Sequence, residues 1–112
     1  MNKIEVVKAL NSIIEDLNHF DDAIELIDKG NGIYVIVSED REPHVQLIVR
    51  NDTLYILDLI NPDNYQSHLF TDIKDIHAQN ISDDLDPEDD DWNEEAFVIR
   101  IELVDGTEID LD

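Results

Sequence analysis

The sequence predicts an α+β fold, in which an N-terminal helix packs on a mainly antiparallel sheet of four to six strands that ends in a C-terminal hairpin. Three observations predict it. Apolar residues near the start recur at helical spacing, short β-branched runs separated by turn residues follow, and apolar and polar residues alternate near the end. The 112 residues are 42% hydrophobic and include 16 isoleucines, which is enough for the core of a single domain spanning 1–112.

The first element is a helix from about Lys3 to Leu17. Asn2 is a good N-cap residue, and Glu5, three residues later, is its capping-box partner. Apolar residues then follow at helical spacing, and we expect them to face the core. These residues are Ile4, Val7, Leu10, Ile14 and Leu17.

The stretch 23–28 fits two interpretations. Ile24 and Ile27 extend the helical stripe, with Gly30 as its stop, or the stretch is a strand that turns at 29–32 into a second strand at 33–37. The hairpin is favoured because the run Ile33-Tyr34-Val35-Ile36-Val37 is strongly strand-like and needs a neighbour.

Two further strands are expected at 45–49 and 54–59, joined by a tight turn at Asn51-Asp52. Both faces of this hairpin are apolar, which indicates a central place in the sheet with cover on both sides or a second layer. The expected pairs are Val49 with Leu54 and Leu47 with Ile56 on one face, and Ile48 with Tyr55 on the other.

The stretch 60–80 is the least readable. A turn is expected at 61–64. The spacing of Leu69, Phe70, Ile73 and Ile76 fits a short helix, but 70–77 also fits an edge strand, and both interpretations stay open. Residues 82–95 hold nine acidic residues, no basic residue and Pro87. We expect a solvated or poorly ordered acidic loop there.

The C-terminal hairpin can be assigned a register. A two-residue loop at Asp105-Gly106 would set apolar residues opposite acidic ones, whereas a three-residue loop with Gly106 in the left-handed region matches the apolar faces. The matched pairs are Ile101 with Ile109 and Ile99 with Leu111, which leaves Arg100 opposite Asp110 and Glu102 opposite Glu108 on the polar face.

The charge is extreme and uneven. The formal net charge is −22, and residues 57–112 carry 18 acidic residues against two basic ones. This charge disfavours binding to nucleic acid or to an anionic membrane. The sequence has no Cys, no leader pattern and no apolar run near the roughly 18 residues of a membrane span. We therefore expect a soluble, cytoplasmic protein.

No motif for catalysis, a cofactor or a metal is found. An EF-hand alignment that starts at Asp84 fails, because Asp89 stands where the loop needs glycine and Pro87 interrupts it. No pair of the four histidines has metal-ligand spacing, and no nucleophile elbow or phosphate-binding glycine loop occurs. The expectation is a protein that is not an enzyme and that needs no cofactor.

The negative field is the strongest functional signal. Duplex DNA carries about one charge per 1.7 Å of axis, so 22 charges match roughly 37 Å of duplex. A rigid carboxylate array of this kind fits a basic nucleic-acid channel. Trp92 either folds back on the core or anchors an interface. The residues expected to bind the partner are Asp83, Asp84, Asp86, Glu88, Asp89, Asp90, Asp91, Trp92, Glu94, Glu95, Glu102, Glu108 and Asp110.

In charge, size and plan the chain resembles the small acidic DNA-mimic inhibitors of phages and mobile elements, some anti-CRISPR proteins among them. The resemblance lies in general character and assigns no residue. It implies a partner that is a basic protein, such as a nuclease or a nucleic-acid-binding protein. Two other hypotheses remain: an immunity protein or antitoxin that neutralises a basic toxin, and an acidic structural or assembly protein with no inhibitory role.

Overall fold

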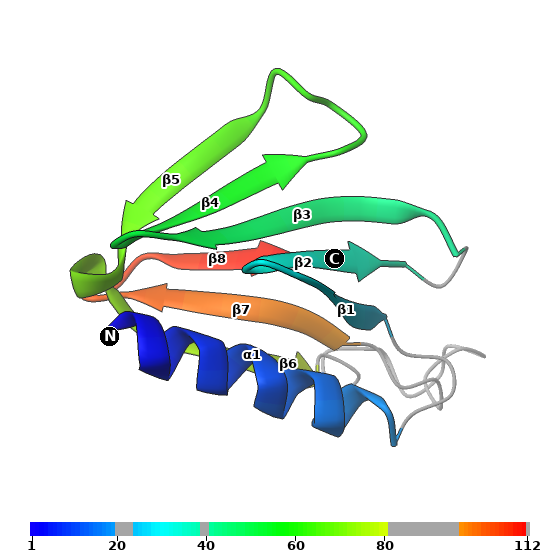
Figure 1. Ribbon diagram of the computed structural model, residues 1–112, viewed down its shortest axis with the longest axis horizontal. Helices are drawn as coiled ribbons and strands as arrows, with labels where there is room; N and C mark the ends of the chain where they lie inside the picture. The colour runs from blue at the N-terminus through cyan, green and yellow to red at the C-terminus, as the bar shows by residue number, and fades with distance from the viewer. Residues whose placement is uncertain (20–23, 39–40, 81–96, 112) are drawn as a thin grey trace, which may run out of the picture.

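The computed structural model describes residues 1–19, 24–38, 41–80 and 97–111 (Figure 1). One helix and two antiparallel sheets make up this part of the chain. Figure 1 shows β3, β4 and β5 at the top, α1 and β6 at the bottom, and β1, β2, β7 and β8 at heights between them. The α+β class, the N-terminal helix and the C-terminal hairpin are as the sequence predicts.

Helix α1 spans Lys3–Leu17 and begins with the expected capping box. The Glu5 backbone N–H donates to the Asn2 side chain at 2.9 Å, and the Asn2 N–H donates to the Glu5 carboxylate at 3.1 Å. The buried face differs from the expected stripe, because Ile4 is 67% exposed and Val6 is fully buried. The helix contacts strands β6, β1 and β3, and this packing turns a neighbouring stripe inward: Val6, Leu10, Ile13 and Leu17.

The five-stranded sheet has the order β1-β2-β3-β4-β5, and all neighbours are antiparallel. The hairpin interpretation is confirmed within the described residues 24–37. The first strand runs to Gly30 and not to Asp28, which leaves a two-residue turn at Asn31-Gly32 in which both residues have positive φ. The hairpin β3–β4 has the expected register and lies inside the sheet. The strands are β1 (Glu25–Gly30), β2 (Ile33–Val37), β3 (Pro43–Arg50), β4 (Thr53–Asp58) and β5 (Tyr65–Leu69).

The three-stranded sheet has the order β6-β7-β8, with β6 at Ile73–Asn80, β7 at Phe97–Leu103 and β8 at Glu108–Leu111. The three-residue loop between β7 and β8 is confirmed, and the strand pairs are those expected from the sequence. Gly106 has φ +94°, as that loop requires. Its N–H donates to the Leu103 carbonyl, and the Leu103 N–H donates to the Thr107 carbonyl.

The stretch 60–80 resolves into two strands around a single 3₁₀ turn. The edge-strand interpretation is close to the structure, since η1 (Phe70–Asp72) leads directly into β6, which is an edge of its sheet. The other interpretation, a short helix, is limited to this 3₁₀ turn. Strand β5 has no counterpart in the sequence prediction, because all five of its residues are at least partly exposed and show no apolar face.

One hydrophobic cluster joins the helix and the two sheets. It contains residues of α1, of β1–β4 and of β6–β8, together with Phe70. The terminal ammonium of Met1 donates to the carbonyls of Phe70 and Ile73 at 2.9 Å each, which ties the start of α1 to the start of β6. No helix in the described ranges is long and apolar enough to cross a membrane.

Candidate functional site

The outer side of the three-stranded sheet carries two rows of polar side chains. Strand alternation sends Ile76, Ile99 and Ile101 inward, so their neighbours point outward. The pairing places one row of carboxylates side by side across the three strands, Asp75–Glu102–Glu108. The next row is His77–Arg100–Asp110. We call these six residues the carboxylate face.

The first row has a regular spacing. Neighbouring strands lie about 4.8 Å apart, so three carboxylates span roughly 10 Å across the sheet, and rows repeat about every 6.7 Å along it. The side chains of Asp75 and Glu108 are about half exposed. This row therefore presents solvent-accessible negative charge from rigid strands.

Arg100 neutralises part of the second row. Its Nε donates to Asp110 Oδ1 at 2.7 Å and its Nη2 donates to Asp110 Oδ2 at 3.2 Å, while Glu108 Oε2 lies 3.8 Å from the same Nε. The bidentate bond to Arg100 lowers the pKa of Asp110 below its usual value. The hydrogen bond to Asp110, and to a smaller degree the neighbouring carboxylates, raise the pKa of Arg100. Asp110 is thus less available to a partner than the sequence prediction assumes.

His77 is paired in the same face. Its Nδ1 lies 3.0 Å from Asp75 Oδ2, and its side chain is 32% exposed. In the described ranges, no group of three or more His, Asp or Glu side chains is placed to hold a metal ion.

The predicted site residues fall into two groups. Glu102, Glu108 and Asp110 lie together on the carboxylate face, in the expected register. The acidic run 83–95, with Trp92 and the rejected EF-hand alignment, lies outside the described residues. Asp75 and His77 complete the face and were missed, because the sequence left 70–77 open between helix and strand; the edge-strand alternative was the signal that leads to them.

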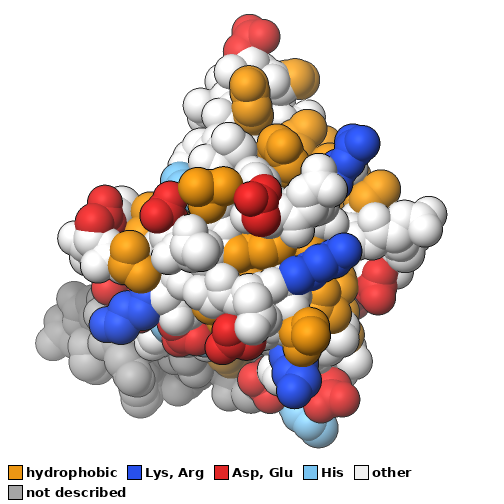
Figure 2. All heavy atoms as spheres, turned by 60° about the vertical axis from the view of Figure 1, so that its left-hand side comes forward, with side chains coloured by type: hydrophobic (Ala, Val, Ile, Leu, Met, Phe, Trp, Pro, Cys, Tyr) orange, Lys and Arg blue, Asp and Glu red, His pale blue; other side chains and the backbone are white. Residues whose placement is uncertain are grey.

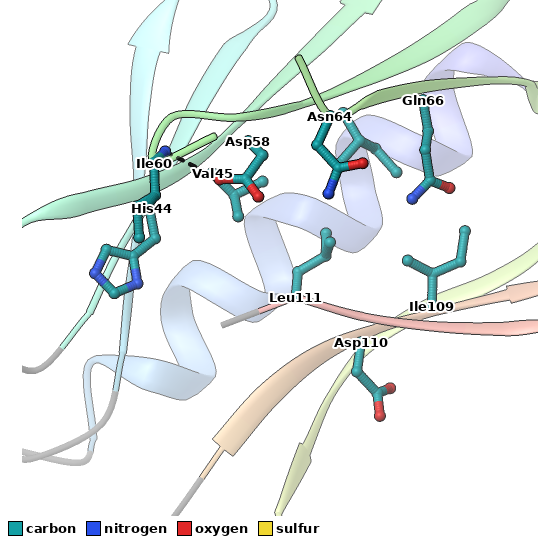
Figure 3. Close-up of a pocket in the computed structure, with 10 residues that line it drawn as sticks. His44, Val45, Asp58, Ile60, Asn64, Gln66, Ile109, Asp110 and Leu111 are labelled. Atoms are coloured by element: carbon teal, nitrogen blue, oxygen red, sulfur yellow. Dashed lines mark hydrogen bonds between the residues drawn. The ribbon is translucent and has the colours of Figure 1, made fainter. Parts of the chain in front are cut away.

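A cavity of about 350 Å³ lies between the two sheets on the open side of β8 (Figure 3). Val45 and Ile56 line it from the five-stranded sheet. Ile109 and Leu111 point into it from β8, while Asp110 points away toward the outer face. Asn64 and Gln66 extend into it from the β4–β5 hairpin. The lining is thus mixed: aliphatic side chains come from both sheets, and the polar groups include the amides of Asn64 and Gln66 as well as His44 and Asp58.

The described surface is not uniformly acidic. Fifteen of the 29 acidic residues and all seven basic residues lie in the described ranges, which leaves a net charge of −8 there. Figure 2 shows acidic, basic and hydrophobic side chains interspersed on one face of the molecule. The carboxylate row Asp75–Glu102–Glu108 differs from this background, because three acidic residues are adjacent and no basic residue separates them.

Comparison with family models, with curated proteins and with solved structures found no match to this chain.

Proposed function

We propose that this chain is an acidic inhibitor that mimics nucleic acid and blocks a basic nucleic-acid-binding protein or nuclease. In this proposal it acts by binding and not by catalysis, and its partner is a protein. The observation that carries the proposal is the row Asp75–Glu102–Glu108, in which three carboxylates on adjacent strands form a rigid, partly exposed array.

Rigidity gives the array its value to a basic partner. The inward neighbours of these carboxylates, among them Ile76 and Ile101, are buried in the core, so the strands are fixed before binding. A preorganised row costs less conformational entropy on association than carboxylates on a mobile chain. The net charge of −22 adds long-range steering toward a positive surface.

The test is capture of basic proteins from host lysate at low salt, followed by elution with a salt gradient and, separately, with a DNA or RNA oligonucleotide. If the chain occupies a nucleic-acid channel, the oligonucleotide should displace the captured protein, because both compete for one site. Capture that withstands excess oligonucleotide would contradict the mimicry, and would favour a partner bound outside its nucleic-acid channel.

A matched pair of variants locates the contact. Asp75→Asn/Glu102→Gln/Glu108→Gln removes the row, and Glu15→Gln/Asp16→Asn/Asp63→Asn removes the same charge from exposed positions elsewhere. The first variant should lower the association rate and flatten the salt dependence more than the second. Equal effects would show that only total charge matters and would remove the row from the proposal.

A further inference from the structure

The two sheets differ in width: one has five strands and the other has three. In Figure 1 β5 and the β4–β5 hairpin rise away from β8. Both faces of β5 are largely exposed, with Tyr65 at 66% and Leu69 at 46% on one face and Gln66 exposed on the other. The cavity between the sheets lies on the side of β5, where a fourth strand beside β8 would lie.

Among the described strands, β8 has a neighbour on one side only, so its other edge presents backbone hydrogen-bonding groups. Directly opposed residues of an antiparallel pair alternate between hydrogen-bonded and non-hydrogen-bonded positions. The Leu103 N–H donates to the Thr107 carbonyl at 2.8 Å, so Thr107 faces β7. By the alternation, the backbone groups of Ile109 and Leu111, two and four residues later, also face β7. The backbone N–H and C=O groups of Glu108 and Asp110 consequently point to the other side, where the described strands include no neighbour.

We infer that the edge of β8 accepts an extended segment of the partner as a fourth strand, with apolar residues alternating with Lys or Arg. Strand addition to a free edge is a common mode of peptide recognition. The inward side chains of such a segment would lie beside Ile109 and Leu111 and enter the cavity that Ile56 and Gln66 also line. This inference rests on the proposed function, from which it takes the basic character of the partner.

The carboxylates of β8 favour a basic segment at this edge over a second copy of the chain. The outward side chains of an added strand lie next to Glu108 and Asp110. Arg100 already engages Asp110 at 2.7 Å and is more distant from Glu108, at 3.8 Å, so a cation from the partner is drawn mainly to Glu108. A second copy of this chain that paired through its own β8 would set carboxylates against carboxylates, which disfavours self-association at this edge.

The test uses a short capped peptide in which isoleucine and lysine alternate, labelled and kept dilute so that it stays monomeric. A scrambled peptide of the same composition is the control for charge. A second control carries N-methyl groups on the amides that would face β8. We expect both controls to bind about tenfold more weakly or worse. The scrambled peptide loses the alternation that places its apolar side chains on one face, and the methylated peptide loses the backbone N–H donors.

Two variants of the protein, each with one arginine substitution on a different face of β5, test whether the peptide enters the cavity. Gln66 lines the cavity and pairs with buried Ile56, whereas Ser67 pairs with Tyr55 on the opposite face. Gln66→Arg should block the peptide and Ser67→Arg should not, although both add the same charge at an exposed position. Hydrogen exchange should slow at the Glu108 and Asp110 amides when the peptide is bound.

The outcomes separate this inference from the proposed function. Equal binding of scrambled and alternating peptides, or unchanged exchange at Glu108 and Asp110, would overturn strand addition even if basic proteins are still captured and displaced by oligonucleotide. A third outcome is that the peptide protects these amides, but the oligonucleotide does not displace the captured basic protein. That outcome would support strand addition and count against nucleic-acid mimicry. Dimers that mask the β8 edge would also overturn the inference.

Discussion

At the scale of single residues, the hydrogen bonds that fix the turns and the carboxylate face are local and mostly readable. The capping box of Asn2 and Glu5 and the positive φ of Gly106 follow from short sequence patterns. The bidentate bond of Arg100 with Asp110 does not, because opposite positions in a register leave the rotamers of both side chains open. Its effect, a partly neutralised row, was therefore absent from the sequence prediction.

Removal of the Asp110 carboxylate should change stability in a pH-dependent way. The pKa of Asp110 is lowered in the folded protein, so its contribution is complete above the unfolded value of about 3.9 and is lost as pH falls through the folded value. Asp110→Asn should cost less than about 1 kcal/mol near neutral pH, since the Asp110 side chain is about half exposed. The melting temperature of Asp110→Asn should approach that of the wild type as pH falls from neutral to acid. A difference in melting temperature that stays constant over this pH range would contradict a lowered pKa of Asp110.

Two glycines with positive φ allow a test of the β1–β2 turn. A Cβ on Gly32 would lie 2.5 Å from the Val49 carbonyl oxygen, whereas a Cβ on Gly106 would meet nothing within 4 Å. Both alanine variants should lose about 1–2 kcal/mol from the left-handed backbone. Gly32→Ala should lose more, and chemical denaturation measures the difference. Equal losses would show that the turn relaxes away from β3.

At the scale of elements, predictions succeeded where one strand constrains another. The two-residue turn at Asn51-Asp52 fixed the register of β3–β4, and matching apolar faces fixed that of β7–β8. Strand β6 stayed ambiguous for a physical reason: a register shift between Ile73 and Asp75 lets Ile73 and Ile76, three residues apart, both face the core. This spacing is the one a helix would have. Strand β5 has no buried face, so its sequence lacks the period-two signal altogether.

The register shift in β6 predicts an unusual pattern of mutational cost. In a regular strand, residues three apart face opposite sides, and only one would be buried. Here Ile73 is fully buried and Ile76 is 3% exposed. Ile73→Ala and Ile76→Ala should each cost about 2–5 kcal/mol, while Lys74→Ala, at an exposed position, should cost little. Unfolding in urea checks all three, and a negligible cost at either isoleucine would contradict the bulged pairing.

At the scale of the whole molecule, the candidate site was predicted in part. The polar face of the C-terminal hairpin, with Glu102, Glu108 and Asp110, was expected from alternation alone. Its third strand was not, since the neighbour of β7 across the sheet is a long-range pairing that no local pattern specifies. The cavity beside β8 depends on how two sheets of unequal width stack, and it is likewise invisible in the sequence.

The net charge predicts that the protein does not bind nucleic acid. A chain at −22 repels the phosphate backbone, which normally supplies most of the affinity through counterion release. Gel-shift assays with DNA and RNA oligonucleotides at physiological salt should show no complex. A tight complex with either oligonucleotide would contradict both the electrostatic argument and the proposed mimicry.

The same charge predicts that salt stabilises the fold. Twenty-nine acidic residues against seven basic ones repel one another in the compact state more than in the expanded chain. At about 0.1 M salt the screening length is roughly 10 Å, shorter than most distances across the molecule, so the repulsion between distant carboxylates is largely removed. We expect the melting temperature to rise from low to moderate NaCl concentration, as measured by circular dichroism.

A charge-reduced variant separates screening from general salt effects on apolar burial. Asp89→Asn/Asp90→Asn/Asp91→Asn removes three charges from the densest acidic run of the sequence. If repulsion is the cause, this variant should start from a higher melting temperature at low salt and gain less from added NaCl, because fewer charges remain to be screened. An equal gain in both proteins would assign the effect to apolar burial, which salt also strengthens. No gain in either would mean that the fold already disperses its carboxylates well enough for repulsion to be small.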